Sequence, residues 1–221
     1  MKFGIVTFPG SNCDYDAYRA AVDVMEADAE YLWHKDQDLK GADIIILPGG
    51  FSYGDYLRPG AIARFSPIMN SVIAHAKRGA PVLAVCNGFQ IACEAGLLPG
   101  ALLRNESLHF VSDRAGLIVE NAETLFTSEY VKGEQLEMPV AHGDGRFFAD
   151  ERVLDEIEGQ GQVVFRYTDN PNGSARDIAG IVNREGNVLG MMPHPERALD
   201  MLLGSEHGLP LFQSLMAGAL R

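Results

Sequence analysis

Short apolar runs that end in turn residues alternate along this chain with segments of helical periodicity. A short run of apolar or β-branched residues bounded by Gly, Pro, Asn or Asp is typical of a buried strand, and apolar residues at helical spacing are typical of a helix. On these criteria we expect strands at residues 3–8, 43–47, 82–85, 116–120, 138–141, 162–167, 178–183 and 188–192. We expect helices at residues 15–26, 62–78, 89–94 and 209–220.

The order of these elements changes halfway along the chain. The first half alternates strand and helix, which is typical of βαβ units and a parallel sheet. Residues 116–192 are rich in strands and poor in helices, so part of the sheet should be antiparallel, with a hairpin turn at residues 183–187. No repeat or linker-like segment is evident. The sequence therefore predicts one α/β domain over residues 1–221, with a mostly parallel central sheet flanked by helices and some antiparallel strands in the second half.

Three of the expected strands end in residues that could carry chemistry. Strand 43–47 is followed by Pro48-Gly49-Gly50, strand 82–85 by Cys86, and strand 188–192 by Pro193-His194-Pro195-Glu196. In open α/β sheets, ligands bind outside the carboxyl ends of the strands. We therefore expect these three segments to meet at one edge of the sheet.

The composition is ordinary for a globular protein, and the net charge is acidic. Apolar residues make up 47% of the 221 residues and charged residues 22%, and the formal net charge is −12. Because phosphates repel a net acidic protein, neither a nucleic-acid surface nor an anionic-membrane surface is expected. The three cysteines form no Cys-x-x-Cys pair, so neither a disulfide framework nor a zinc knuckle is expected. Without a signal-peptide pattern or a long apolar run, the expected location is a reducing cytoplasm.

The setting of Cys86 points to a nucleophile. An apolar strand stops at this residue, and a helix-compatible segment that begins Asn87-Gly88-Phe89-Gln90 follows at once. A thiol at a strand-to-helix turn lies at a helix amino terminus, where unpaired N–H groups and the helix dipole favour the thiolate. Gly88 lets the turn tighten, and the arrangement resembles the nucleophile elbow of hydrolases. A buried core cysteine is the competing interpretation for Cys86 and the expected role of Cys93. Cys13 lies in a strand-to-helix turn, where a structural role is expected.

A distant His-x-Glu pair could supply the base that such a thiol needs. His194 and Glu196 follow the last expected strand, and Pro193 and Pro195 should hold the segment extended. Residues i and i+2 of an extended segment face the same side, so Glu196 could accept a hydrogen bond from one ring nitrogen of His194 while the other nitrogen faces Cys86. A solvated loop with incidental charges is the competing interpretation. Together the three residues predict a Cys-His-Glu site for acyl transfer.

The turn Pro48-Gly49-Gly50 could stabilise the charge that forms during such a reaction. Acyl transfer through a thiol produces a tetrahedral oxyanion, which needs positioned hydrogen-bond donors. Backbone N–H groups at a glycine turn can approach closely because no Cβ intervenes. The N–H groups of Gly50 and Asn87 are the expected donors. For Gly50, an ordinary glycine turn is the stronger competing interpretation.

A second His-x-carboxylate pair consists of His142 and Asp144, within a glycine turn. His142 could contact substrate, and a structural role in the turn is an equal alternative. Together with His194, this pair formally spells a two-His-one-carboxylate metal site. A metal there would leave Cys86 unexplained, so no metal site is expected.

With these residues identified, the chain resembles the class I, triad-type glutamine amidotransferases. More narrowly, it is similar to the glutaminase subunits of phosphoribosylformylglycinamidine synthase, a purine-biosynthesis enzyme. The resemblance runs nearly end to end and rests on FPGSNCD from Phe8, LPGGFSYGDYLRPGAIA from Leu47, CNGFQ from Cys86, EAGLLPGAL from Glu94, AHGDGRF from Ala141, NPNGS from Asn170 and GNVLGMMPHPERA from Gly186. The PGGFSYGDYLR run and the MMPHPER ending are specific to the narrower group. Ala84 departs from the family pattern, which usually has Gly two residues before the nucleophile.

The resemblance implies a fold and an activity. The family fold is flavodoxin-like, with a mostly parallel sheet flanked by helices. Cys86 would attack the side-chain amide of L-glutamine, with His194 as base and then acid and with Glu196 as its orienter. Gln90 and the loop of His142 would hold glutamine. Ammonia would leave, and water would then release glutamate from the thioester.

The resemblance also implies partners and cofactors. The ammonia would pass to a separate synthetase subunit that makes phosphoribosylformylglycinamidine with ATP and Mg²⁺, so the complex would be an ATP-dependent carbon–nitrogen ligase. A small third subunit would bridge the two. No cofactor is implied for this chain itself, which has no Gly-x-x-x-x-Gly-Lys-[Ser/Thr] phosphate loop. Two other functions stay open: a stand-alone cysteine hydrolase of a related α/β fold, and a non-catalytic binding protein that kept the fold.

Overall fold

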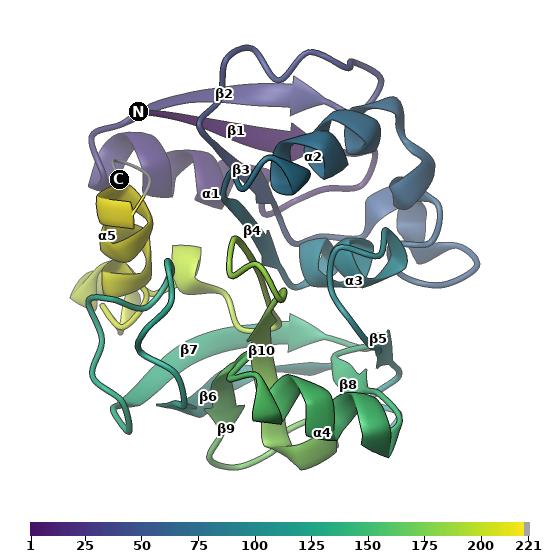
Figure 1. Cartoon of the computed structure of the whole chain (residues 1–221), viewed down its shortest axis with the longest axis vertical. Coiled ribbons are helices and arrows are strands. Elements are labelled where there is room, and N and C mark those ends of the chain that lie inside the picture. The colour runs from purple at the N-terminus through teal and green to yellow at the C-terminus, as the bar shows by residue number, and fades with distance from the viewer. Residues whose placement is uncertain (219–221) are drawn as a thin grey trace.

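The described part of the chain, residues 1–218 of a computed structural model, is built around one nine-stranded sheet (Figure 1). In order across the sheet, the strands are β2 (Asp28–Trp33), β1 (Lys2–Thr7), β3 (Ile44–Leu47), β4 (Val82–Val85), β11 (Val188–Met191), β10 (Ile178–Val182), β9 (Val163–Tyr167), β6 (Val111–Val119) and β7 (Gln135–His142). A separate antiparallel pair consists of β5 (Ala101–Leu103) and β8 (Arg146–Phe148). Strands from the whole length of the chain therefore share one sheet, with β4 and β11 near its centre.

The sheet changes from parallel to antiparallel at β11. β2, β1, β3, β4 and β11 run parallel to one another, and β10, β9, β6 and β7 continue the sheet with antiparallel pairing. β10 and β11 form the expected hairpin, in which the N–H of Asn183 donates to the carbonyl of Val188 and the N–H of Gly186 donates to the carbonyl of Asn183. The predicted α/β class, with antiparallel strands in the second half, is confirmed.

The helices within residues 1–218 pack against this sheet. They are α1 (Asp14–Arg19), which continues as a π-helical turn over Ala20–Val24, α2 (Pro67–Lys77), α3 (Asn87–Glu94), α4 (Glu151–Gly159) and α5 (Leu209–Gly218). In Figure 1, α1 and α5 lie to the left of β4, and α2 and α3 lie to its right. β3, β4 and β11 are completely buried, which is why their sequences are apolar throughout. Of the helix expected at residues 209–220, the last two residues lie outside the described part of the chain.

The hydrophobic pattern of the sequence did not predict four elements: β2, β5, β8 and α4. β2 is an edge strand in which Leu32 is the one buried residue, so it has no continuous apolar run. β5 and β8 are only three residues long. α4 is amphipathic and buries Leu154 and Ile157, and Asp150 caps it by accepting a hydrogen bond from the N–H of Val153. Weak or short apolar signals explain all four omissions.

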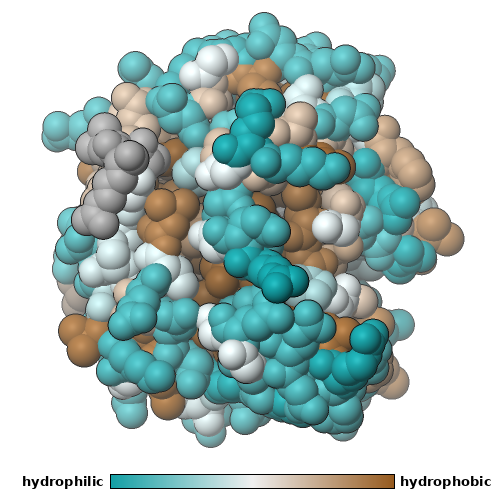
Figure 2. All heavy atoms as spheres, in the orientation of Figure 1, coloured by the Kyte–Doolittle hydropathy of each residue, from teal (hydrophilic) through white to brown (hydrophobic). Residues whose placement is uncertain are grey.

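Large apolar side chains lie in the core of the molecule. Large side chains such as Phe3, Phe89, Phe126, Phe165 and Phe212 are fully buried. Figure 2 shows one face of the molecule, on which hydrophilic residues predominate and hydrophobic residues gather in separate patches. Within residues 1–218, none of the helices combines the length and the apolar character that crossing a membrane requires.

The expected meeting of three strand ends is confirmed. β4 lies between β3 and β11 and is parallel to both, with Leu47 paired to Ala84 and Met191 paired to Val85. Because the carboxyl ends of parallel strands lie at the same edge, the segments after β3, β4 and β11 emerge side by side. These segments contain Gly49, Cys86 and His194, respectively.

Gly88 allows α3 to begin directly against the end of β3. A Cβ added at Gly88 would lie 1.9 Å from the carbonyl oxygen of Leu47, so backbone would have to move. We expect Gly88→Ala to lower the free energy of unfolding by about 3 kcal/mol, because overpacking a buried contact forces such shifts. Chemical denaturation measures this change.

Gly159 provides a matched control for Gly88. It ends α4, and a Cβ added there would meet no atom within 4 Å. Gly159→Ala should leave stability unchanged or raise it by up to about 1 kcal/mol, because alanine has the better helix propensity. Equal stability of the two variants would contradict the close packing of α3 on β3.

Candidate active site

Cys86 occupies a strained turn between β4 and α3. Its backbone has φ 52° and ψ −107°, a combination that non-glycine residues rarely adopt and that surrounding structure must enforce. Its N–H donates to the carbonyl of Met191 at 2.8 Å, which ties the turn to β11. The thiol is 3.7 Å from the carbonyl oxygen of Ala141 at the end of β7. This strand–turn–helix geometry is that of a nucleophile elbow.

His194 and Glu196 form a buried hydrogen-bonded pair. Nδ1 of His194 lies 2.6 Å from Oε1 of Glu196, and both side chains are almost fully buried. The backbone N–H of His194 donates to the carbonyl of Pro139 at 2.8 Å, which fixes the segment against β7. The expectation of an extended segment needs one correction, because Pro195 begins a 3₁₀ turn that runs to Arg197. Proline suits the first position of such a turn, where its missing N–H costs nothing.

The imidazole of His194 is held in a strongly polar environment despite its burial. Burial disfavours the charged ring, but the charges of Glu196 and Cys86, together with contacts to Cys13 and Cys86, raise the pKa of His194 well above its ordinary value. Nε2 of the ring has no hydrogen-bond partner within residues 1–218. Once the ring has taken up a proton, it can stabilise a neighbouring thiolate and can later donate that proton.

Gly49 is the point on which the side chains of the site converge. A Cβ added there would lie 2.7 Å from Cε1 of His194, 3.0 Å from Sγ of Cys13 and 3.3 Å from Cβ of Cys86. Only glycine leaves room for the three side chains to share this space. The structure thus brings Cys86 and His194 together, as their positions in the sequence predict.

A small cavity of about 220 Å³ lies beside these residues. Its lining consists of Asn12, Cys13, Gly50, Phe51, Cys86, Phe110, Ala141, His194 and Arg197. The rings of Phe51 and Phe110 stack with their centroids 6.4 Å apart, and both are about half exposed. Because drug-sized ligands occupy cavities of about 300–1,000 Å³, this cavity suits a smaller molecule.

The predicted oxyanion donors lie at this cavity or next to it. Gly50 lines the cavity with φ 140°, and within residues 1–218 its N–H donates no hydrogen bond. Asn87 is the first residue of α3, where a backbone N–H has no partner inside the helix. The side-chain oxygen of Asn87 accepts a hydrogen bond from the N–H of Ser52 at 3.1 Å, so it joins the loop after Gly50 to the turn of Cys86. The oxyanion role itself stays a prediction.

Gln90 belongs to a polar network behind Asn87. Its side-chain oxygen accepts from Nδ2 of Asn87 at 2.8 Å, and its Nε2 donates to the carbonyl of Asp144 at 2.7 Å. Asp55 joins this network through Nδ2 of Asn87 at 3.3 Å. Burial and then the nearby charge of Asp144 raise the pKa of Asp55 to about 6. Gln90 does not line the cavity in this structure, and its predicted contact with substrate stays a prediction.

His142 is buried in a setting that favours the structural alternative. Its Nδ1 faces the side-chain oxygen of Asn105 at 3.2 Å, and its Nε2 faces Nδ2 of Asn172 at 3.4 Å. Burial, and then the charge of His194, lower the pKa of His142 to about 4, so the ring is neutral. Because both ring nitrogens already have partners, these contacts hold the glycine turn that begins at Gly143.

Cys13, His194 and Glu196 form a group with metal-ligating atoms within 4.8 Å of one another. The formal site of His142, Asp144 and His194 is not among the groups that residues 1–218 bring together. Two ligands bound to one zinc ion at about 2.0–2.1 Å in tetrahedral geometry lie more than about 3 Å apart. The 2.6 Å separation of Nδ1 and Oε1 is shorter and is that of a hydrogen bond. The residues present therefore suit proton transfer better than metal binding.

Sequence reasoning missed several side chains of the site, among them Cys13 and Arg197. Cys13 was expected to be structural, and Arg197 was not singled out, yet both line the cavity. Cys13 follows β1, which lies beside β3 in the sheet, so its turn reaches the same edge as Gly49. The turn Pro9-Gly10-Ser11 after the first strand is the signal that could have found it, because it resembles the other strand ends.

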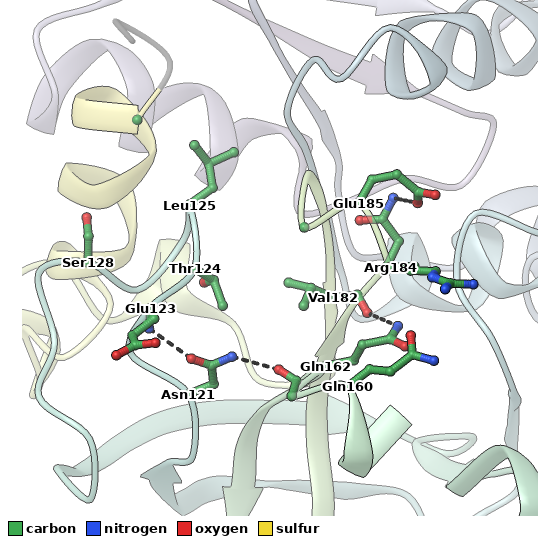
Figure 3. A pocket seen from close by; sticks show the side chains of 14 residues that line it. Asn121, Glu123, Thr124, Leu125, Ser128, Gln160, Gln162, Val182, Arg184 and Glu185 are labelled. Carbon is green, nitrogen blue, oxygen red and sulfur yellow. Dashed lines mark hydrogen bonds between the residues drawn. The ribbon is translucent and has the colours of Figure 1, made fainter. Parts of the chain in front are cut away.

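A larger cavity of about 690 Å³ lies at the opposite end of β11 (Figure 3). It is lined by residues that follow β6, by the end of α4 and by the β10–β11 turn, including Asn121, Gln160, Gln162, Arg184 and Glu185. Its amides are satisfied within the chain: Asn121 donates to the carbonyl of Gly161, and Gln162 donates to the carbonyl of Val182. Its lining, as far as the chain is described, contains neither a cysteine nor a histidine, so size alone does not make it the reactive site.

Comparisons with known proteins agree with this geometry. Residues 1–208 match the family described as the CobB/CobQ-like glutamine amidotransferase domain. The chain is 58% identical over 217 residues to phosphoribosylformylglycinamidine synthase subunit PurQ of Nostoc sp. (strain PCC 7120), covering 98% of this chain and 97% of the relative. The subunit of the same name from Trichormus variabilis has the same identity and coverage.

Solved structures show the same fold. The structure of PurLQS from Thermotoga maritima contains a chain that matches with a TM-score of 0.90 and 45% identity, covering 98% of this chain and 97% of that one. A glutaminase domain of CTPS from Trypanosoma brucei matches with a TM-score of 0.65 and 15% identity, covering 100% of this chain and 94% of that one. At that identity, the second match supports the fold alone.

Proposed function

This chain belongs to the CobB/CobQ-like glutamine amidotransferase family, and we propose on that basis that it is the glutaminase subunit of a phosphoribosylformylglycinamidine synthase. It would hydrolyse L-glutamine to glutamate and ammonia and deliver the ammonia for purine biosynthesis. One observation supports the chemistry above all others: a cysteine in a strained elbow shares a small cavity with His194, whose ring is hydrogen-bonded to the buried Glu196.

The proposed reaction begins with Cys86. His194 takes the thiol proton, and the thiolate attacks the side-chain amide carbon of glutamine to form a tetrahedral oxyanion. The N–H groups of Gly50 and Asn87 stabilise that oxyanion. Protonated His194 then gives its proton to the departing nitrogen. The nitrogen leaves as ammonia, and a γ-glutamyl thioester remains on Cys86. Water, deprotonated by the same ring, attacks the thioester, and glutamate leaves as the thiol is restored.

Glu196 supports both halves of this cycle. Its carboxylate accepts a hydrogen bond from Nδ1 of His194, which leaves Nε2 to exchange protons with the thiol and the substrate. The same carboxylate stabilises the ring when it is charged. Gln90 and the loop of His142 are candidates for contacts with the amino-acid end of glutamine. To make such contacts, both would have to lie closer to the cavity than they do in this structure.

The rest of the reaction belongs to partners. We propose that the ammonia passes to a synthetase subunit that uses ATP and Mg²⁺, and that a small bridging subunit completes the complex. No cofactor is proposed for this chain. We place the reaction in the cytoplasm, because all three cysteines lie within the described residues and are free thiols, as a reducing compartment would keep them.

Two alternatives find less support. A stand-alone peptidase needs a cleft long enough for a peptide chain, whereas the cavity beside Cys86 has a volume of only about 220 Å³. A binding protein that kept the fold has no need of the strained elbow or of the buried His–Glu pair. Both alternatives also leave the near full-length match to PurQ proteins without a reason.

The decisive comparison is glutamate release by this chain alone and in the assembled complex. We expect the isolated chain to be nearly idle and the complex with the synthetase subunit, the small subunit, ATP and the formylglycinamide substrate to release glutamate and amidine in equal amounts. An enzyme-coupled glutamate assay and chromatography of the product measure both. Brisk hydrolysis by the isolated chain, or cleavage of peptides, would favour the stand-alone hydrolase instead.

A further inference from the structure

A second buried thiol lies beside the proposed catalytic pair. Sγ of Cys13 is within 4.8 Å of a ring nitrogen of His194 and of a carboxylate oxygen of Glu196, and Cys13 is 3% exposed. It lines the same cavity as Cys86. The mechanism above gives it no part, although a buried polar atom so close to a proton-transferring ring affects that ring electrostatically.

The sulfur of Cys13 is fixed from several sides. Nη2 of Arg197 donates to Sγ at 3.0 Å, and Nε of the same guanidinium is held by Asp16 at 2.9 Å. The thiol donates to the side-chain oxygen of Asn12 at 3.2 Å. The backbone N–H of Cys13 donates to the carbonyl of Gly49 at 3.3 Å. A core cysteine that only fills space would not need this set of polar partners.

These contacts join the beginning of α1 to the segment that carries the proposed base. Asp16 belongs to α1, whereas Arg197 directly follows Glu196. The sulfur of Cys13 and the ring of His194 share the space that a side chain on Gly49 would fill. The thiol therefore limits how far the ring can turn away from Cys86 and Glu196.

We propose that Cys13 is a positioning residue for His194: it holds the imidazole in line with Cys86 and Glu196 and stabilises the charged form of the ring. This inference rests on the proposed function, because it assigns a role within that reaction. Its physical basis is that a misplacement of a reacting group by about 1 Å can cost on the order of 100-fold in rate.

The electrostatic effect of Cys13 on the pKa of His194 has a definite direction. The groups that face His194 are Glu196, Cys86, Cys13 and neutral His142, and Arg197 donates to the Cys13 sulfur. Burial raises the pKa of Cys13 itself, so it is a neutral thiol whose sulfur lone pairs can face the charged ring. Contact with Cys13 raises the pKa of His194, so removing the sulfur should lower that pKa.

The test compares Cys13→Ala and Cys13→Ser in the assembled complex, with Cys93→Ala as a matched thiol deletion. Cys93 lies near the end of α3, where its thiol is 3.7 Å from the carbonyl of Pro99. We expect Cys13→Ala to lower kcat for glutamine hydrolysis by about 10-fold to about 100-fold while KM changes by less than about twofold. The basic limb of the pH profile should move to lower pH. Cys13→Ser should recover most of both, and Cys93→Ala should match the wild type.

Three results would overturn the inference. In the first, Cys13→Ala has the kcat and pH profile of the wild type. In the second, activity falls only in proportion to the folded fraction, with an unmoved pH profile and no gain from serine. If Cys13→Ala does not fold, Cys13→Ser is compared with Cys13→Val, and equal kcat values would count against a polar role. A wild-type complex that releases no glutamate would instead overturn the proposed function, and this inference with it.

Discussion

Replacing Cys86 with alanine should lower glutamine hydrolysis by at least about 10⁴-fold, because the thiol at the elbow is lost and loss of a catalytic nucleophile has effects of this order. The thiol projects from a strained turn and makes a 3.7 Å hydrogen bond to the carbonyl of Ala141. Its removal should therefore leave the fold intact. Glutamate release in the assembled complex and circular dichroism of the variant measure the two parts of this prediction.

Two controls separate lost chemistry from lost assembly. The Cys86→Ala complex should still make the amidine when ammonium chloride replaces glutamine, because the synthetase chemistry takes place on the partner. Cys93→Ala, a second thiol deletion in the same helical segment, should retain glutaminase activity. Wild-type glutamate release by Cys86→Ala would exclude a covalent mechanism at this residue.

Replacing Glu196 with glutamine should lower kcat by about 10²-fold to about 10⁴-fold. The carboxylate can only accept from Nδ1 of His194, at 2.6 Å, and so it selects the tautomer with Nε2 free to act as base. An amide can also donate, which stabilises the wrong tautomer; the loss in kcat for the corresponding change in the Ser-His-Asp triad is of the order of 10⁴. Steady-state kinetics with glutamine measure the change, and Glu206→Gln serves as an exposed control in a neighbouring segment.

The pH profile of glutamine hydrolysis provides an independent test of the Glu196→Gln prediction, because the direction of its shift can be predicted. The pKa of His194 lies well above its ordinary value, with the charge of Glu196 as the largest contribution that raises it. Activity that needs the protonated ring is present below this pKa and is lost as the pH rises through it. Removing the carboxylate lowers the pKa, so the basic limb of the profile should move to lower pH. An unmoved limb would mean that Glu196 does not control the charge of the ring.

The fold could be predicted from the sequence wherever elements are buried on both sides. β3, β4 and β11 are short apolar runs with sharp ends, and their parallel pairing follows from the alternation of strand and helix. β2 could not be recognised in this way, because an edge strand buries only Leu32. The order of strands was also beyond the sequence pattern, since β6 and β7 lie beyond β9 at the far edge.

The candidate site, too, could be predicted only where its residues directly follow buried strands. Cys86, His194 and Glu196 each follow a buried strand, so their positions are visible in the sequence. The structure places Cys86 and His194 at one cavity beside Gly49, and Glu196 on Nδ1 of His194. Cys13 was not recognised, because its approach depends on β1 lying next to β3. The hydrogen-bond partners of His142 are Asn105 and Asn172, which lie in two loops. No local sequence pattern indicates that these loops meet.

The central claim is that Cys86 is a nucleophile made reactive by His194 and directed at glutamine. The most direct test is intact-protein and peptide mass spectrometry after exposure of the assembled complex to a diazoketone analogue of L-glutamine, which alkylates an activated thiol. We expect one adduct, located at Cys86, with Cys13 and Cys93 unmodified and with protection by excess glutamine. An unmodified Cys86, or equal labelling of all three thiols without protection by glutamine, would contradict the account.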